Sequence, residues 1–396
     1  MIILGIETSC DETGVCIIEV ENDQVKVLGN QLYSQIAKHQ EFGGVMPMLA
    51  KREHAKNLVP LFKKCLEEAN LYLPIRTNMP IEPDKEISKE KIQEINKILE
   101  RESELLAELL KLLETIEKPK IGAISVTNGP GLEPALWVGV TFAKALSVAW
   151  NIPLIATNHM EGHIVVSTLQ KVESENSKFY ILNSTTYPAI ALLISGGHTQ
   201  LVFIKGPMDY KIVGGTRDDA VGEAFDKVAR MLGLPYPGGP QISLYAEEWK
   251  KKNSPTGLFN FPRPMIHSKD LDFSFSGLKT SVLYRIKEIG ELTKEMKQEI
   301  AFEFKEAVID VLVSKTRTAI LEYSAKTLIV GGGVIADKNI RLALEVLTKE
   351  LNINFQLPEI SASTDNALMI ALAGYMNILA GKKPTTDFKA NGNLSL

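Results

Sequence analysis

The start of the chain alternates short hydrophobic runs with polar segments. Residues 2–6 and 15–20 are rich in β-branched side chains, and the polar segment 7–14 separates them. Two such runs joined by a polar turn predict a β-hairpin, and residues 25–34 predict a third strand. Apolar residues spaced by three and four then predict a helix over 54–69. The chain therefore opens with a β-rich region followed by a helix.

The rest of the chain predicts two series of strands and helices. In the first, strand 121–127 leads through helix 135–149 to strand 154–156, an order that predicts parallel strands joined by a right-handed crossover. The second half begins with a hairpin around the turn 195–199, and its predicted elements are strands at 189–194, 201–204, near Ile212 and at 327–330, and helices near 220–232, 299–324 and 339–351. Because each half begins with a hairpin whose turn is polar and small, we expect an internal structural duplication.

Between about residues 84 and 118 the composition shifts to Glu, Lys, Leu and Ile. Apolar residues there follow alternating steps of three and four, and Glu102 is the one polar break in the stripe. This pattern predicts one long amphipathic helix. Such a helix can bind a partner or pack on its own domain, and we expect the second arrangement.

Composition narrows the class of protein. The 396 residues suffice for two domains, and a hydrophobic content of 45% with a net charge of only -4 excludes a disordered chain. Three cysteines, Cys10, Cys16 and Cys65, form no CxxC pair. An odd number without that spacing excludes a disulfide scaffold and indicates reduced thiols in the cytosol.

The same features indicate a soluble cytoplasmic protein with no membrane partner. The N-terminus lacks the basic segment of a signal peptide. The longest apolar run, 135–156, contains Lys144, Gly139 and Pro153, so it predicts a buried helix and strand rather than a membrane span. Near-neutral charge argues against binding nucleic acid through bulk electrostatics alone, and leaves open a local basic patch or a partner that supplies one.

Three turns at predicted strand ends are built from Gly, Ser and Thr: residues 8–9, 195–199 and 331–333. Glycine lets the backbone approach a ligand closely, and exposed amides and hydroxyls then hold phosphate oxygens. Each turn alone is also ordinary turn chemistry, whereas three facing one cleft would form a nucleotide site. None matches a GxxxxGK[ST] loop or a GxGxxG dinucleotide fingerprint.

Two histidines are placed for metal binding. His159 and His163 lie four residues apart, so on a helix both rings share one face. The intervening Glu161 is in the wrong place for the base of an HExxH metalloprotease. A third ligand is needed, and Asp365, in a polar turn before the last apolar helix, is the best candidate. An isolated HxxxH pair is more often a surface feature, so the pair alone does not establish a metal site.

Two further groups have open roles. Four acidic residues around one predicted helix start can act on a nucleotide or complement the helix dipole: Asp218, Asp219, Glu223 and Asp226. The segment 273–279 can form an aromatic-lined loop or a buried strand end.

Taken together and in order, the motifs resemble one family. They are GIETSCDET (5–13), GGV through His54 (43–54), NGPGL (128–132), HMEGH (159–163), SGGHT (195–199), GEAFDK (222–227), YPGG (236–239), FSFSGLK (273–279), GGGV (331–334) and TDNA (364–367). This series resembles the bacterial and mitochondrial branch of the tRNA N6-adenosine threonylcarbamoyltransferases, a family once described as sialoglycoprotein endopeptidases. The resemblance covers nearly the whole chain except about residues 72–118.

The resemblance implies an α/β, actin-like fold, shared with sugar kinases and heat-shock chaperones. Two ribonuclease-H-like lobes would enclose a central nucleotide cleft. The N-terminal lobe would take 1–158, including a helical insertion at about 72–118, and the segment 364–396 would complete it. The C-terminal lobe would take 159–363.

The implied reaction is acyl transfer. The N6 amine of adenosine 37, in tRNAs reading ANN codons, would attack the carbamoyl carbon of threonylcarbamoyl-AMP and release AMP. Such a reaction needs positioning and charge stabilisation more than an enzyme nucleophile. Bacterial members work with a paralogous partner of the same fold and a small ATPase, and the insertion could alter how the partner docks.

Site residues carry over from the resemblance by position. His159, His163 and Asp365 would hold one divalent ion, Fe²⁺ or Zn²⁺, and Glu12 would orient the reacting groups. The substrate would contact Leu193, Ile194, Ser195, Gly196, Gly197, Asp226, Gly239 and Asp337. The last is a departure, because the family usually has Asn there. An Asp accepts a hydrogen bond but cannot donate one, and it adds charge beside an anionic ligand.

Three other functions compete with this one. An ATP-dependent small-molecule kinase of the same fold is the main alternative, but it has no use for HxxxH with a distant Asp. A metallopeptidase would need a base beside the metal, and Glu161 is badly spaced for that role. A scaffold equivalent to the inactive paralogous partner would be expected to lose the histidine pair.

Overall fold

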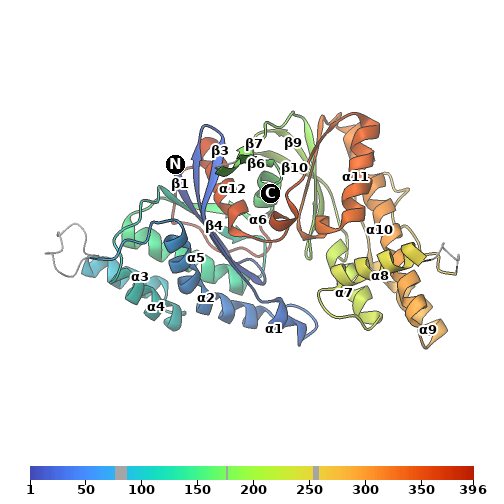
Figure 1. Cartoon of the computed structure of the whole chain (residues 1–396), viewed down its shortest axis with the longest axis horizontal. Helices are drawn as coiled ribbons and strands as arrows, with labels where there is room; N and C mark the ends of the chain where they lie inside the picture. The colour runs from blue at the N-terminus through green and yellow to red at the C-terminus, as the bar shows by residue number, and fades with distance from the viewer. Residues whose placement is uncertain (76–86, 175–176, 253–257) are drawn as a thin grey trace. The chain divides into compact units, whose positions relative to one another are not determined.

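The computed structural model describes residues 1–75, 87–174, 177–252 and 258–396. They form two compact units, the first made of residues 1–35, 45–183 and 365–396, and the second of 36–44 and 184–364. Figure 1 labels the elements of both units. The first unit continues past the expected boundary at residue 158, because the segment up to residue 183 packs on its helices and adds strands to its sheet.

A seven-stranded mixed sheet forms the centre of the first unit, in the order β5-β4-β1-β2-β3-β7-β6. Its strands are β1 (Ile2–Glu7), β2 (Glu12–Glu21), β3 (Gln24–Ser34), β4 (Ala123–Gly129), β5 (Leu154–Asn158), β6 (Leu169–Ser174) and β7 (Ser177–Leu182). Strands β1, β2 and β3 are antiparallel, whereas β4 and β5 run parallel to β1. The predicted hairpin is confirmed, and the β6–β7 hairpin was not predicted.

The second unit repeats the first five strands of this arrangement. Its sheet has the order β10-β9-β8-β11-β12. Read from β12, this order matches β5-β4-β1-β2-β3 of the first unit. The strands are β8 (Ala189–Ile194), β9 (Thr199–Gly206), β10 (Asp209–Gly215), β11 (Thr327–Gly331) and β12 (Asn354–Gln356). Strands β8, β9 and β10 are antiparallel, and β11 and β12 run parallel to β8. Equal strand order and equal strand directions confirm the predicted structural duplication and the mixed α/β class.

Helices cover both sheets. The first unit contains α2 (Pro47–Glu68), α3 (Lys89–Ile98), α4 (Ser103–Leu113), α5 (Glu133–Trp150), α6 (His159–Val166) and α12 (Ala367–Leu379). The second contains α1 (Ile36–Gln40), α7 (Val221–Met231), α8 (Gly238–Lys252), α9 (Ser276–Ile289), α10 (Lys294–Glu322), α11 (Lys338–Leu351) and the 3-10 helices Gly333–Ala336 and Ile360–Ala362. Helices α8 and α9 were not predicted. None of the described helices is both long enough and apolar enough to span a membrane.

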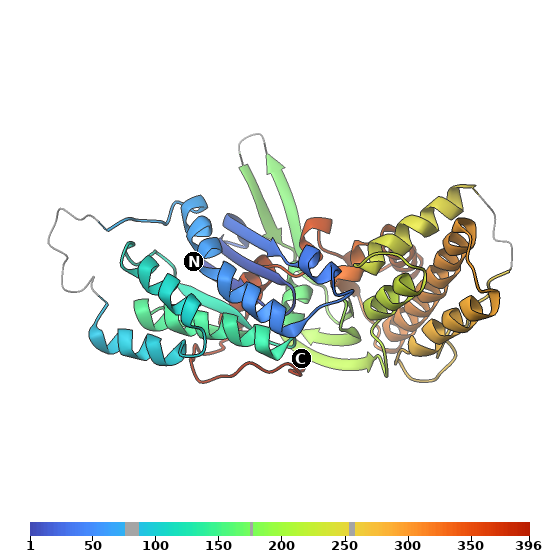
Figure 2. The ribbon, with the colours of Figure 1, turned by 90° about the horizontal axis from the view of Figure 1, so that it is seen from below.

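The prediction of one long amphipathic helix is wrong, because the segment forms two helices, α3 and α4, separated by a short turn. The break lies at Glu102, whose carboxylate pairs with Lys51 of α2 at 2.7 Å instead of entering the apolar stripe. The expectation that the segment packs on its own domain is confirmed. Ile95 and Leu109 are fully buried in the core of the first unit, and Figure 2 shows α3 and α4 beside α2 and α5.

We predict that Leu109→Ala lowers the free energy of unfolding by about 2–5 kcal/mol, because it leaves a cavity beneath α4. Glu108→Ala, on the exposed side of the same helix, is the matched control and should change it by less than about 0.5 kcal/mol. Denaturant unfolding measures both. Equal midpoints for Leu109→Ala and the unsubstituted protein would show that the helix pair does not contribute to the core.

Candidate functional site

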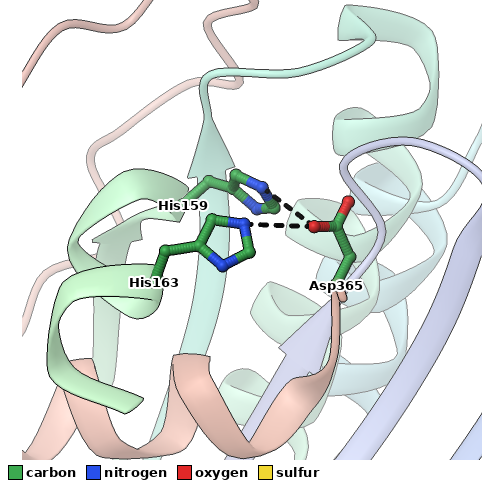
Figure 3. A group of neighbouring side chains, drawn as sticks. All are labelled: His159, His163 and Asp365. Atoms are coloured by element: carbon green, nitrogen blue, oxygen red, sulfur yellow. Dashed lines mark ion pairs between the residues drawn. The ribbon is translucent and has the colours of Figure 1, made fainter. Parts of the chain in front are cut away.

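Three side chains far apart in sequence meet in the first unit. His159 and His163 lie on α6, which begins directly after β5, and Asp365 lies just before α12. Figure 3 shows both rings turned toward the Asp365 carboxylate. The Asn158 side chain caps α6 by accepting from the Met160 amide at 2.8 Å. The HxxxH spacing therefore does place both rings on one helix face, as predicted.

The ligand atoms of the three residues are close enough to share one ion. The Nε2 atoms of His159 and His163 lie 3.3 and 3.2 Å from Oδ1 of Asp365, and one ligand atom from each residue lies within 4.8 Å of the others. Both histidines are buried, and the Asp365 side chain is 19% exposed. Among the described residues, His163 Nδ1 has no hydrogen-bond partner.

A second carboxylate orients His159. Glu7 is the last residue of β1 and is fully buried, and its Oε2 lies 3.2 Å from His159 Nδ1. The same oxygen accepts from the Thr127 hydroxyl at 2.5 Å, and Oε1 accepts from the Ser9 amide at 2.5 Å. A carboxylate bonded to the far nitrogen of a histidine is the usual support of a metal ligand. Sequence reasoning missed Glu7, although an acidic residue at the end of a buried strand was the available signal.

The donor set fits a divalent transition metal. Two imidazoles and one carboxylate suit Zn²⁺ or Fe²⁺, and three protein ligands leave coordination positions open for a substrate. The cluster lies at the carboxyl ends of the parallel strands β1 and β5, the edge at which α/β sheets bind ligands. His159, His163 and Asp365 are therefore the residues that could hold a metal ion.

Burial and charge shift three pKa values in this region. Burial alone would lower the pKa of His159, but Asp365 and Glu7 raise it well above its usual value. Burial opposes ionisation of Asp365, yet the two histidines hold its pKa below the usual range. Burial, together with Asp11 and Asp365, raises the pKa of Glu12 to about 10. The cluster thus brings together carboxyl groups whose ionised forms a bound cation would favour.

Glu12, expected in the first turn, is the first residue of β2. Its Oε1 accepts from the Ser34 hydroxyl at 3.3 Å. Because Asp365 contributes to the raised pKa of Glu12, the structure brings Glu12 into the electrostatic field of the candidate metal ligands.

In the second unit, the predicted phosphate loop follows a buried strand. Leu193 and Ile194 are buried in β8, whereas Gly196 and Gly197 are exposed in the turn to β9. A Cβ on either glycine would meet nothing within 4 Å. Ser195 closes the turn by accepting, through Oγ, from the His198 amide at 3.1 Å.

Other predicted substrate residues lie near this turn. A Cβ at Gly222, in the first turn of α7, would come within 2.7 Å of the Ser195 carbonyl oxygen, so α7 begins against the turn. Further along α7, Asp226 Oδ1 accepts from the Gly238 amide at 2.7 Å, which holds the start of α8 beside it. Gly239 follows on α8, with open space where a side chain would be. The structure therefore joins Asp226 and the 238–239 segment in one contact.

Asp337 has a structural role that the sequence did not reveal. Its Oδ1 caps α11 by accepting from the Asn339 and Ile340 amides at 2.9 and 3.0 Å. Its Oδ2 pairs with the buried ammonium of Lys305 at 2.6 Å and accepts from the Ser243 hydroxyl. The extra charge expected from Asp in place of Asn is therefore balanced by Lys305.

Asp218 and Asp219, just before α7, both contact residues of α9. Asp218 accepts from the Ser274 and Ser276 hydroxyls and from the Phe275 and Ser276 amides, so it caps α9 rather than α7. Asp219 pairs with Lys227 and Lys279. Phe273 and Phe275 are fully buried, so the 273–279 segment is not an aromatic-lined loop open to solvent.

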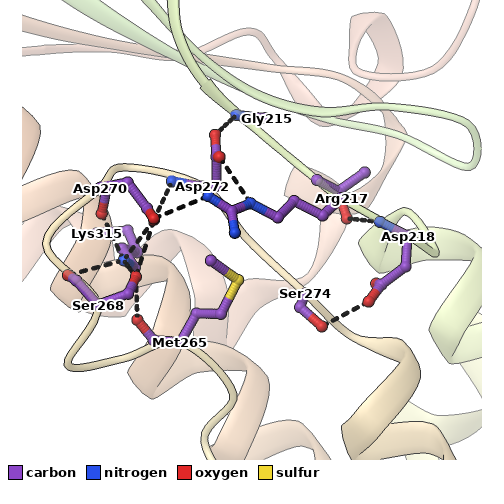
Figure 4. Close-up of polar contacts among 10 residues, drawn as sticks. Gly215, Arg217, Asp218, Met265, Ser268, Asp270, Asp272, Ser274 and Lys315 are labelled. Carbon is purple, nitrogen blue, oxygen red and sulfur yellow. Dashed lines mark hydrogen bonds and ion pairs between the residues drawn. The ribbon is translucent and has the colours of Figure 1, made fainter.

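A charged network holds the segment before α9. Arg217 pairs with Asp270 and Asp272 at 2.9 Å each, and the buried Lys315 of α10 donates to the Ser268 hydroxyl and the Asp270 carbonyl at 2.6 Å (Figure 4). These contacts hold the chain just before Phe273, and the Asp218 hydrogen bonds hold it just after. The network therefore supports the segment that leads to the Asp218 cap of α9.

Comparisons with known proteins identify the family. The family profile described as tRNA N6-adenosine threonylcarbamoyltransferase matches residues 26–74 and 97–372, and so extends through both units. The chain belongs to this family. One curated relative, a tRNA N6-adenosine threonylcarbamoyltransferase of Chromobacterium violaceum, is 40% identical over 96% of this chain and 93% of its own length. The profile omits residues 75–96, within the predicted insertion.

Two solved structures share a more distant likeness with this family member. A full-length HypF in the phosphate- and nucleotide-bound form has a TM-score of 0.45 at 10% identity, covering 72% of this chain and 43% of that one. HypF of T. kodakarensis has a TM-score of 0.47 at 12% identity, covering 71% and 44%. This chain spans less than half the length of either structure.

We predict that Glu7→Gln lowers the affinity of the metal-free protein for Zn²⁺ by about 10- to 100-fold, because His159 loses its charged hydrogen-bond acceptor. Glu161→Gln is the control, since Glu161 lies on the same helix but bonds to Asn377 instead. Competition against a chromophoric chelator measures both affinities. An unchanged affinity in Glu7→Gln would contradict the assigned role.

We predict that Asp218→Asn lowers the free energy of unfolding at pH 7 by about 1 kcal/mol, because the α9 cap loses a charged acceptor. Burial opposes ionisation, but hydrogen bonds from Ser274 and Ser276 lower the pKa of Asp218 below its usual value. A lowered pKa gives stability above the pKa of the unfolded chain that is lost as the pH falls through the folded value. Urea unfolding at pH 7 and pH 3 should therefore show the difference shrinking in acid, with the exposed Asp209→Asn as the neutral control.

Proposed function

We propose that this chain transfers the threonylcarbamoyl group of threonylcarbamoyl-AMP to the N6 amine of adenosine 37 in tRNAs that read ANN codons. The observation that carries the proposal is the match to a named threonylcarbamoyltransferase over 96% of the chain at 40% identity. The family profile extends through both units and includes His159, His163 and Asp365.

The transfer is an acyl substitution. The N6 nitrogen forms a bond to the carbamoyl carbon, the bond from that carbon to the phosphate oxygen breaks, and AMP leaves with the electron pair. The amine loses one proton, which the released phosphate or solvent takes up. Because the mixed anhydride is already activated, the protein's task is to hold the two substrates in line and to stabilise charge on the leaving phosphate.

His159, His163 and Asp365 would hold the metal ion, with Glu7 and Ser9 fixing the His159 ring. A bound Zn²⁺ or Fe²⁺ would supply Lewis-acid stabilisation of phosphate or carbamoyl oxygens. Glu12 would orient the reacting groups from the start of β2.

The second unit would bind the nucleotide portion. The exposed turn after Ile194 offers the Gly196 and Gly197 amides to phosphate without side chains in the way. Asp226 and Gly239 would contact the ribose and base. Asp337 would act indirectly, since its carboxylate already caps α11 and pairs with Lys305.

The family match does not favour the kinase alternative, and the three-residue cluster gives a further reason against it. A phosphoryl-transfer enzyme does not require two buried histidines beside a carboxylate. As parts of the same proposal, the enzyme works in the cytoplasm, with a paralogous partner of the same fold and a small ATPase. The α3–α4 pair packs against its own unit, which supports an insertion that leaves the catalytic residues unaffected.

We predict that His163→Ala and Asp365→Ala each lower transfer at least about 100-fold, because a Lewis acid contributes several kcal/mol of charge stabilisation. The substrates are threonylcarbamoyl-AMP and an unmodified ANN-decoding tRNA, with and without the partner proteins, and mass spectrometry of nucleosides detects the product. Chelation should abolish transfer, and added Zn²⁺ or Fe²⁺ should restore it.

His267→Ala is the matched control, because it removes an exposed histidine of the second unit. Full transfer by chelated enzyme or by both variants would overturn the metal role alone. Absence of product under every condition, with metal and adenylate bound, would overturn the proposed transfer itself.

A further inference from the structure

We propose that His54 is a positioning residue: it holds the turn between β1 and β2 so that Ser9 and Glu12 keep their places beside His159 and Asp365. His54 lies on α2, outside the candidate ligands and substrate contacts, and its side chain is fully buried. The catalytic consequence rests on the proposed transfer, whereas the structural consequence can be tested without it.

The turn's backbone carbonyls need partners from outside the turn. Residues 8–11 lie between two strands, so the sheet ladder does not satisfy them. Three consecutive carbonyls are met by three different elements. Ser9 accepts from the Leu132 amide at 2.7 Å, Asp11 accepts from the Gln35 amide at 2.9 Å, and Cys10 accepts from His54 Nε2 at 3.0 Å.

His54 is the sequence-specific member of this set. The bonds from Leu132 and Gln35 come from backbone amides, which almost any residue supplies, whereas the bond to Cys10 requires a particular side chain. The ring's other nitrogen, Nδ1, lies 2.7 Å from the Thr13 hydroxyl at the start of β2. The His54 ring therefore forms hydrogen bonds on both sides of Glu12 in the sequence.

The hydrogen-bond partners define the state of the ring. A carbonyl oxygen only accepts, so Nε2 carries the hydrogen and donates to Cys10. In a neutral imidazole Nδ1 then accepts, and the Thr13 hydroxyl and the Gln35 side-chain amide, at 2.7 and 3.4 Å, are both able to donate to it. Each ring nitrogen is thus matched to a partner of complementary type.

The turn that His54 holds is hydrogen-bonded to His159, one of the candidate metal ligands. The Ser9 hydroxyl lies 3.2 Å from His159 Nδ1, and the Ser9 amide donates to Glu7. Glu12 and Cys10 both lie within the electrostatic influence of Asp365. A displacement of the turn would therefore move groups that surround both His159 and Asp365.

The test compares two variants. His54→Leu replaces the ring with an apolar side chain of similar size, whereas the amide of His54→Gln can still donate to Cys10. The first readout is the rate at which iodoacetamide alkylates Cys10, measured by mass spectrometry in each variant and in the unsubstituted protein. Cys16 and Cys65 are fully buried and serve as internal controls for global unfolding. We expect His54→Leu to accelerate alkylation of Cys10 at least tenfold, with Cys16 and Cys65 unchanged and His54→Gln close to the unsubstituted protein.

The second readout is transfer to tRNA. Because a misplacement of about 1 Å costs up to about 100-fold in rate, we expect kcat of His54→Leu to fall about 10- to 100-fold while KM for tRNA stays within about threefold. His54→Gln should recover most of kcat. Thr13→Val should share part of the loss, and the double variant should lose less than the product of the two single losses.

Equal acceleration at all three cysteines, or an unchanged kcat in folded His54→Leu, would overturn the positioning role. A protein that shows the Cys10 result but whose unsubstituted form transfers nothing to tRNA would retain the turn-holding role and overturn the proposed function. The two failures are therefore distinguishable.

Discussion

The buried carboxylate of Glu7 is the constraint around which the first unit is arranged. A fully buried charge is tolerated only when hydrogen bonds surround it, and Glu7 receives them from β4, from the turn after β1 and from α6. Satisfying this group therefore fixes three segments at once. Because one of those segments carries His159, the same bonds that make burial tolerable also orient a candidate metal ligand.

Asp365 reaches the histidines because α12 lies unusually close to the sheet. A Cβ at Gly5 of β1 would come within 2.3 Å of the Ala367 carbonyl oxygen, and one at Gly374 of α12 would come within 2.4 Å of the Ser125 side chain. Because Gly5 and Gly374 have no Cβ, α12 can pack directly against β1 and against the Ser125 side chain of β4. Asn366 caps the helix by accepting from the Met369 amide at 3.0 Å, so the residue before it is held at the helix start.

Sequence reasoning predicted the parts of the fold that follow from local pattern. Hairpins, the parallel β4–β5 order and the HxxxH face are dictated by alternation, helical spacing and polar turns, and the structure has them. The sequence shows Glu102 as a polar break, but not its pairing with Lys51, a partner about fifty residues away. Glu7, His54 and the pairing of Asp337 with Lys305 were missed for the same reason, since their roles exist only through tertiary contacts. Helices α8 and α9 were missed although both have apolar residues at helical spacing, such as Ile242, Ala246 and Trp249 in α8.

The order of the candidate ligands along the chain has a consequence for biosynthesis. Glu7 and His159 are made early, but Asp365 comes near the end of the 396 residues. At ordinary rates of translation, about 10–40 s separate the synthesis of His159 from that of Asp365. The nascent first unit therefore exists for that time without α12, and its histidine pair becomes a three-ligand cluster only after residues 184–364 of the second unit have been made. Metal capture by the complete cluster would accordingly follow synthesis of the second unit.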